Sequence, residues 1–336
     1  MRFLRSIATL AFALAAQAGF AQGKPFVFGV TLPKTGAASH IGLAIEAGIL
    51  VGVKQVNDEG GINGRKIELL VRDSATNPQR AVLAAKELVD EKKVDFLYPE
   101  VISGLTLAVL PYTTEKKMVT LSMGAAARIG DPKEFPYSFQ YADAASRRPP
   151  SMAAALQALG GKKVGILVAN NPATVGTGEI LADVLPKKYG MQVVGLKQFP
   201  VETKDLTANL QAMKDAGADI IAFDSPARDN ARVVMQGLQT LGWKAKVVSG
   251  LSVLSGDMKE LIPAPVHDQF YAVNHRVGTL TGTISPEMQK FIADLRKLGT
   301  INNIALSAEG RDAVWMMKYS RGARLLPGTS VRRDHG

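Results

Sequence analysis

The stretch YPEVISGLT at residues 98–106 decides the fold, because it has the pattern of a strand that turns directly into a helix. Residues 94–98 form a short apolar run that fits a buried strand, and helical periodicity begins at about Leu105. In open α/β sheets, ligands bind at the carboxyl ends of strands, and a helix that begins there favours an anion. Ser103 and Thr106 place hydroxyls at this helix entrance. From this stretch alone, each is either a ligand contact or a simple cap of the helix.

Strands and helices alternate on both sides of this stretch, which predicts βαβ units and parallel sheets. The first series has strands over 26–31, 66–72 and 118–122 and helices over 42–57 and 79–91. The second has strands over 163–169, 192–199, 220–224 and 245–249 and helices over 151–159, 179–188, 205–216 and 230–241. A loop is expected over 170–178, a last strand over 269–273, and helices over 288–298 and 308–318. The sequence therefore predicts an α/β fold of two Rossmann-like lobes with parallel sheets, joined by a hinge.

The chain divides into a leader, two lobes and a tail. Residues 1–21 resemble a secretory signal peptide, with a basic start, an apolar run over 7–16 and small residues before Ala21. We expect the first lobe to contain residues 22–140 and 273–318, and the second lobe to contain residues 141–272. Residues 319–336 are rich in Arg, Gly and Ser and are expected to form a disordered tail.

Composition excludes several classes of function. The 336 residues include no cysteine, so thiol catalysis and thiolate metal sites are excluded. The net charge of +10 is spread without a basic run, which argues against nucleic-acid binding. The four histidines show no metal-ligand spacing and no catalytic motif is present, so we expect neither an enzyme nor a metal or other cofactor. The segment over 29–35 resembles a phosphate-binding loop, but Pro33 stands where that loop needs glycine.

Several motifs resemble the type I periplasmic solute-binding proteins of ABC importers, in the leucine/isoleucine/valine-binding class. FGVTLPKTG at residues 28–36 matches the opening of that class, and NDEGGINGRKI at residues 57–67 is the most specific signature. The resemblance covers residues 24–318 and implies a periplasmic receptor, expected to be a monomer, that closes two lobes on a small carboxylate-bearing solute. A membrane permease would be its partner. The alternative is a ligand-sensing receptor or regulator domain of the same fold.

The resemblance also implies which residues bind the solute. In the family, the loop matching 101–104 and the turn after the next strand hold the ligand carboxylate through hydroxyls and backbone N–H groups. Ser103 is therefore expected to contact the ligand rather than to cap the helix. The residues carried over in this way are Ser103, Gly104, Ser122, Gly124 and Ala125.

Other positions are less defined by the resemblance. Ile41 stands where the family often has an aromatic wall residue. Tyr141, at the predicted change of lobes, either lines the crevice or packs at the hinge. Val175 replaces the usual aromatic residue before a glycine.

The second lobe departs from the amino-acid binders. After the strand ending at Ser249, that class commonly presents an acid to the ligand ammonium, whereas this chain has an acid-free segment that includes Ser252, an expected contact. Asp224 could substitute, or could be a capping or surface acid. Because a buried ammonium without a carboxylate partner is costly, an amine-free aromatic or 2-oxo acid is a candidate beside the branched-chain amino acids.

The family also normally continues beyond residue 318 with a further helix and a lobe crossing, so the carboxyl end is expected to be truncated or altered.

Overall fold

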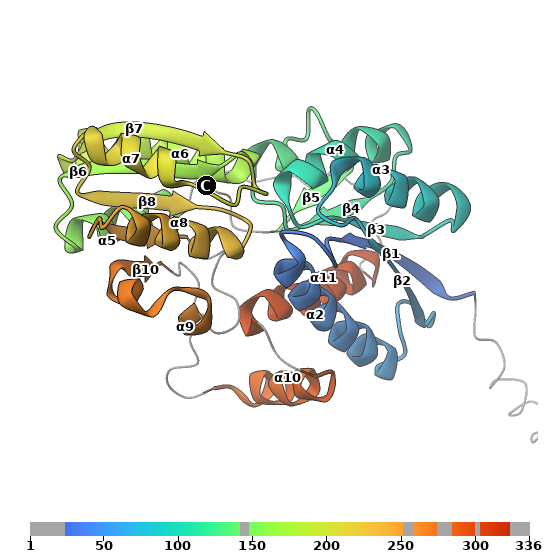
Figure 1. Cartoon of the computed structure of the whole chain (residues 1–336). Helices are drawn as coiled ribbons and strands as arrows, with labels where there is room; N and C mark the ends of the chain where they lie inside the picture. Colours follow the sequence, from blue (N-terminus) through green and yellow to red (C-terminus); the bar gives the residue numbers. More distant parts are fainter. Residues whose placement is uncertain (1–23, 142–147, 251–257, 274–283, 300–302, 323–336) are drawn as a thin grey trace, which may run out of the picture.

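The computed structural model of the chain describes residues 24–141, 148–250, 258–273, 284–299 and 303–322. It consists of two α/β lobes, each built on a five-stranded parallel sheet (Figure 1). The prediction of two parallel-sheet lobes is therefore confirmed. Within the described residues, no helix is long and apolar enough to span a membrane.

The first sheet has the strand order β2-β1-β3-β4-β5. The residues of β1 and β3 are mostly apolar and all of them are buried, as expected for central strands of a parallel sheet. The strands are β1 (Phe26–Leu32), β2 (Ile67–Asp73), β3 (Phe96–Pro99), β4 (Thr120–Ser122) and β5 (Ser138–Gln140). The helices between them are α2 (Ser39–Asp58), α3 (Pro78–Lys86) with a π-helical extension η1 (Glu87–Glu91), α4 (Ser103–Glu115) and the 3₁₀ turn η2 (Ala127–Gly130).

The second sheet has the order β10-β9-β8-β6-β7. Its strands are β6 (Lys163–Ala169), β7 (Gln192–Phe199), β8 (Ile220–Asp224), β9 (Lys246–Ser249) and β10 (Phe270–Ala272). The helices of this series are α5 (Arg148–Ala158), α6 (Pro172–Tyr189), α7 (Thr207–Asp215), α8 (Asp229–Thr240), α9 (Met258–Leu261) and the 3₁₀ helix η5 (Ala264–Gln269). Two further helices follow, α10 (Pro286–Lys297) and α11 (Ile304–Gly322).

Both sheets share one topology, which fixes where a ligand can bind. In each lobe the first strand in sequence, β1 or β6, lies between the second and the third. The chain order reverses at this strand, and ligands of doubly wound sheets bind beyond the carboxyl ends at such a switch point. The segments after β1 and β3, and after β6 and β8, are therefore the places to look for a site.

Helix α11 returns to the first lobe and packs along α2 (Figure 1). Two glycines allow the backbones to approach closely: a Cβ atom at Gly48 would lie 1.7 Å from the Ser307 carbonyl oxygen, and one at Gly310 would lie 2.2 Å from that of Ile45. Ser307 Oγ donates to the Ala44 carbonyl at 2.8 Å. The first lobe is thus completed by a segment far away in the sequence.

Three local predictions need correction. The loop expected over 170–178 is wrong, because α6 begins at Pro172 and the Asn171 side chain caps it by accepting from Ala173 N–H. Strand β5 was not predicted. Helix α11 continues to Gly322, so residues 319–322 of the expected disordered tail are helical.

Candidate functional site

The amino terminus of α4 has no side-chain cap. Its N-cap residue is Ile102, which provides no capping hydrogen bond, whereas Asn77 caps α3 and Asn171 caps α6. The Thr106 hydroxyl donates to the Ile102 carbonyl at 3.1 Å and so does not cap the helix either. The capping alternative for Ser103 and Thr106 is therefore wrong. An uncapped helix start keeps unpaired N–H groups and the positive end of the helix dipole, which together favour an anion.

The structure brings the predicted carboxylate-binding residues together. Ser103 Oγ accepts from the Ala125 and Ala126 N–H groups, both at 3.0 Å, and is buried. Ser122 Oγ accepts from Gly124 N–H at 3.0 Å. The turn after β4 therefore folds onto the start of α4, and three of its N–H groups already have serine partners. The Ser103 hydroxyl keeps its own hydrogen as a donor.

The two lobes meet beside this cluster. A Cβ atom at Gly104 would lie 3.6 Å from both Asn171 Nδ2 and Pro172 Cδ, and Ala125 packs against Ala173. A groove of about 250 Å³ opens here between the lobes. Its lining residues are Thr76, Pro78, Ile102, Gly104 and Leu105 from the first lobe and Asn170, Asn171, Pro172, Pro200, Val201, Glu202 and Pro226 from the second. The uncapped start of α4 thus borders an interlobe groove of a size that suits a small solute.

Glu100 is a buried acid that sequence reasoning missed. It directly follows β3, has no exposed surface and adopts a φ of 86°, a left-handed backbone conformation that a non-glycine residue rarely adopts. Burial raises the pKa of its carboxyl to about 7, against the opposing effect of the nearby Ser74 hydroxyl. Its Oε1 atom has no hydrogen-bond partner within the described part of the chain. A charged residue in a loop normally predicts an exposed side chain, so no local signal pointed to Glu100.

Asp224 is neither a surface acid nor a helix cap. It is the last residue of β8, and its Oδ2 atom lies 3.4 Å from Nη1 of Arg148, the first residue of α5. Burial raises the pKa of the Asp224 carboxyl, although the Arg148 guanidinium opposes this rise. Arg148 was not among the predicted site residues, because nothing local links residue 148 to residue 224.

The remaining predicted contacts lie in several environments. Ile41 is buried in the core of the first lobe. The Tyr141 hydroxyl lies 3.0 Å from that of Tyr98 and donates to the Glu309 carbonyl, so Tyr141 packs within the first lobe. Val175 lies in the second turn of α6. Ser252 lies outside the described residues. Ligand contact by these four residues stays a prediction.

Replacing Ser103 by alanine is expected to lower the free energy of unfolding by about 2 kcal/mol, because two buried N–H groups lose their acceptor. Ser103→Thr keeps a hydroxyl and should recover most of this loss. Urea denaturation of the three proteins checks the result. An alanine variant as stable as the wild type would show that the turn finds other acceptors.

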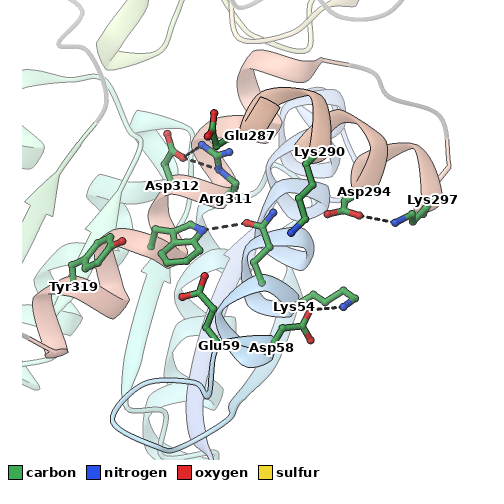
Figure 2. Close-up of a pocket in the computed structure, with 12 residues that line it drawn as sticks. Lys54, Asp58, Glu59, Glu287, Lys290, Asp294, Lys297, Arg311, Asp312 and Tyr319 are labelled. Carbon is green, nitrogen blue, oxygen red and sulfur yellow. Dashed lines mark hydrogen bonds and ion pairs between the residues drawn. The ribbon is translucent and has the colours of Figure 1, made fainter. Parts of the chain in front are cut away.

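A second cleft, of about 680 Å³, lies between α2, α10 and α11. Figure 2 shows the side chains that line it. Three ion pairs join charged side chains of its lining: Lys54 with Asp58, Lys297 with Asp294, and Arg311 with Asp312. Trp315 Nε1 donates to Gln55 at 3.2 Å. Because these charged side chains already engage one another, this cleft is a weaker candidate than the interlobe groove. Across the described residues, no group of three potential side-chain ligands could hold a metal ion.

Comparison with known proteins agrees with this arrangement. Leu/Ile/Val-binding protein homolog 1 of Brucella melitensis is 25% identical over 240 residues, which cover 69% of this chain and 62% of the relative. Homolog 7 of Brucella abortus is 24% identical over 298 residues, 84% of this chain and 73% of the relative. The chain thus spans less than two thirds of the length of the former.

Solved structures show the same fold at low sequence identity. The branched-chain amino acid transporter substrate-binding protein LivJ from Streptococcus pneumoniae, in complex with isoleucine, has a TM-score of 0.76 and 21% identity, covering 89% of this chain and 85% of its own. A solute-binding protein of an ABC transporter from Rhodopseudomonas palustris HaA2, in complex with p-hydroxybenzoic acid, has a TM-score of 0.71 and 21% identity, covering 89% and 82%. The sequence profile of the periplasmic binding protein family matches residues 25–319. With this match over most of its length and two parallel-sheet lobes around a groove, the chain belongs to the periplasmic binding protein family.

Proposed function

We propose that this chain is the solute-binding receptor of an ABC importer, and that it captures a small carboxylate-bearing solute between its two lobes. The observation that supports this proposal most is the uncapped start of α4 at the interlobe groove, beside the buried Ser103 hydroxyl. A carboxylate there would accept hydrogen bonds from the first N–H groups of α4. Because such a solute touches both lobes, it favours their closed arrangement.

Two classes of solute agree with the relatives. The names of the Brucella homologues and the isoleucine bound to LivJ suggest branched-chain amino acids. The p-hydroxybenzoic acid bound to the Rhodopseudomonas protein suggests aromatic acids. The ion pair of Asp224 with Arg148 favours the second class, because Asp224 is then not available to an ammonium group. We therefore propose an amine-free acid, either aromatic or a 2-oxo acid.

The cellular context follows from the family. We propose that residues 1–21 direct export, that the mature protein acts in the periplasm as a monomer, and that its partner is the permease of an ABC importer. The lining of the groove, which has a single acid, Glu202, and many apolar residues, suits binding and release of a solute rather than a reaction.

A thermal-shift screen tests the proposed function. Leucine and its 2-oxo counterpart, 4-methyl-2-oxopentanoate, form a matched pair that differs only at the α-carbon, where a keto oxygen replaces the amine and a hydrogen. The compound 4-hydroxybenzoate represents the aromatic acids. A solute at 100 times its dissociation constant stabilises the native state by about 2.7 kcal/mol and so raises the Tm. We expect the Tm to rise with an amine-free acid and not with 4-hydroxybenzamide, which lacks the carboxylate.

The outcomes separate the classes of solute. A rise in Tm with leucine but not with its 2-oxo counterpart would show that the protein binds an amino acid and finds an ammonium partner. If 4-hydroxybenzamide raised the Tm as much as 4-hydroxybenzoate, the start of α4 would not be a binding site for the solute carboxylate. No response to any of these solutes would contradict a receptor for small carboxylates.

A further inference from the structure

The second lobe contains an incompletely satisfied ion pair at its ligand edge. Arg148 Nη1 lies 3.4 Å from Asp224 Oδ2, which is long for a charge-assisted hydrogen bond. The Arg148 Nε and Asp224 Oδ1 atoms are buried and have no hydrogen-bond partner in the described segments. Orphaned polar atoms on both members of one buried pair are unusual in a native protein and require an explanation.

The pair lies where the second lobe faces the first. Asp224 is the final residue of β8, one of the two strands at the topological switch point, and Pro226 shortly after it lines the interlobe groove. Arg148 begins α5, the first element of the second lobe after β5 of the first lobe. The guanidinium therefore lies at the carboxyl edge of the second sheet, where ligands of this topology bind.

A solute at this edge would meet the guanidinium rather than the carboxylate. The Arg148 side chain is 15% exposed, whereas that of Asp224 is 1% exposed. Gly250 covers the carboxylate from one side, since a Cβ atom there would lie 2.9 Å from Asp224 Oδ1. The accessible member of the pair is thus the cation, which attracts oxygen acceptors and repels an ammonium group.

The geometry of a guanidinium suits this role. It presents five N–H donors in a planar fork, and one nitrogen of Arg148 is engaged with Asp224. The remaining donors can bind a carboxylate or a hydroxyl oxygen with charge-assisted hydrogen bonds. Asp224 then orients the guanidinium from behind without itself touching the solute.

We propose that Arg148 binds the far end of the solute and selects acids that carry a second oxygen acceptor and no amine. This inference rests on the proposed function, in which the α4 terminus holds the first carboxylate. The favoured solutes are dicarboxylic acids and hydroxyl- or oxo-substituted monocarboxylic acids. Asp224 is a positioning residue for Arg148.

Isothermal titration calorimetry with matched aromatic acids tests the proposal. Terephthalate and 4-methylbenzoate have the same shape and differ in the second carboxylate, and 4-hydroxybenzoate carries a neutral oxygen. The wild type should bind at least one of the two oxygen-bearing acids about tenfold or more tightly than 4-methylbenzoate, because hydrogen bonds to a charged donor are the strong ones. Arg148→Met should remove this preference, so that the oxygen-bearing acids bind no more tightly than 4-methylbenzoate.

Two further variants keep the test decisive. Arg232→Met removes a partly exposed guanidinium of α8 that donates to Gln236 on the same helix, so it should keep the wild-type preference. The double variant Arg148→Met with Asp224→Asn removes both charges, so it is expected to fold even if the single variant leaves Asp224 uncompensated. It should show the same loss of preference.

The outcomes distinguish this inference from the proposed function. An unchanged affinity ratio in the Arg148 variants would mean that the ion pair is structural, and would overturn the inference while the receptor function remains. Binding of leucine alone would do the same. A wild type that binds none of these solutes would overturn the proposed function and this inference together.

Discussion

Gly48→Ala is expected to destabilise the protein by about 3 kcal/mol and to lower its Tm by about 5–10 °C. A Cβ atom at Gly48 would lie 1.7 Å from the Ser307 carbonyl oxygen, which is a severe steric clash for two non-bonded atoms. The obstacle is backbone, so no side-chain rotation relieves it. Alanine also favours the helix by up to about 1 kcal/mol, but this gain is smaller than the penalty for moving α11 away from α2.

The matched control is Gly176→Ala in the interior of α6. No atom lies within 4 Å of a Cβ atom built at Gly176, so the same substitution should be neutral or slightly stabilising. Thermal and urea denaturation of the two variants measure the difference. Equal effects at both positions would mean that α11 does not pack on α2 as described.

This contact also matters for function. Helix α11 contributes Trp315, which bonds to Gln55 of α2, and Glu309, whose carbonyl accepts from the Tyr141 hydroxyl. Tyr141 in turn lies beside Tyr98 on β3, the strand that precedes the start of α4 at Ser103. Loosening α11 is therefore expected to disturb the proposed solute site through the Tyr141–Tyr98 pair.

The sequence predicted the parts of the fold that depend on local apolar patterns. Strand β6 (Lys163–Ala169) is an uninterrupted apolar run after its first residue, and its predicted bounds match the structure. The start of α6 was missed because Asn170, Asn171 and Pro172 are typical of a loop, whereas here Asn171 caps the helix and Pro172 occupies its first turn. The three residues of β5 are too few to show any period.

The site was partly predictable for the same reason. Ser122 ends β4 and Ser103 follows the neighbouring parallel strand β3, so their meeting at one sheet edge follows from the order of the strands. The pairing of Arg148 with Asp224 joins positions far apart in the sequence, and it depends on how α5 packs against the second sheet. Burial of Glu100 likewise results from tertiary packing, which overrides the polar preference of its loop.

Glu100→Gln is expected to stabilise the protein at pH 8 by about 3 kcal/mol and to change its stability little at pH 4.5. The pKa of Glu100 is raised by burial from 4.5 to about 7, and each pKa unit corresponds to about 1.4 kcal/mol. Because the native state binds this proton more tightly than the unfolded state, the contribution of Glu100 to stability is greatest below pH 4.5. It falls as the pH rises toward 7 and the carboxyl ionises.

The surroundings of Glu100 explain why ionising its carboxyl costs free energy and why Glu100→Gln avoids this cost. After ionisation, Oε1 has no hydrogen-bond donor within the described residues, and the negative charge of Asp73 adds repulsion. Glutamine has nearly the same shape as the protonated acid and no charge to bury. Its amide can also bond to the nearby Ser74 hydroxyl.

Urea denaturation of both proteins from pH 4.5 to pH 8 measures the difference in slope. Asp224, whose pKa is also raised by burial, changes stability in the same direction, but it is present in both proteins and cancels in the comparison. Glu68→Gln on the exposed face of β2 is the matched control and should leave the pH profile unchanged. Parallel profiles for the wild type and Glu100→Gln would show that the Glu100 carboxyl ionises without penalty, and so that water or a donor reaches Oε1. A steeper profile in the wild type would show that ionisation of this buried acid lowers the stability of the protein between pH 4.5 and pH 7.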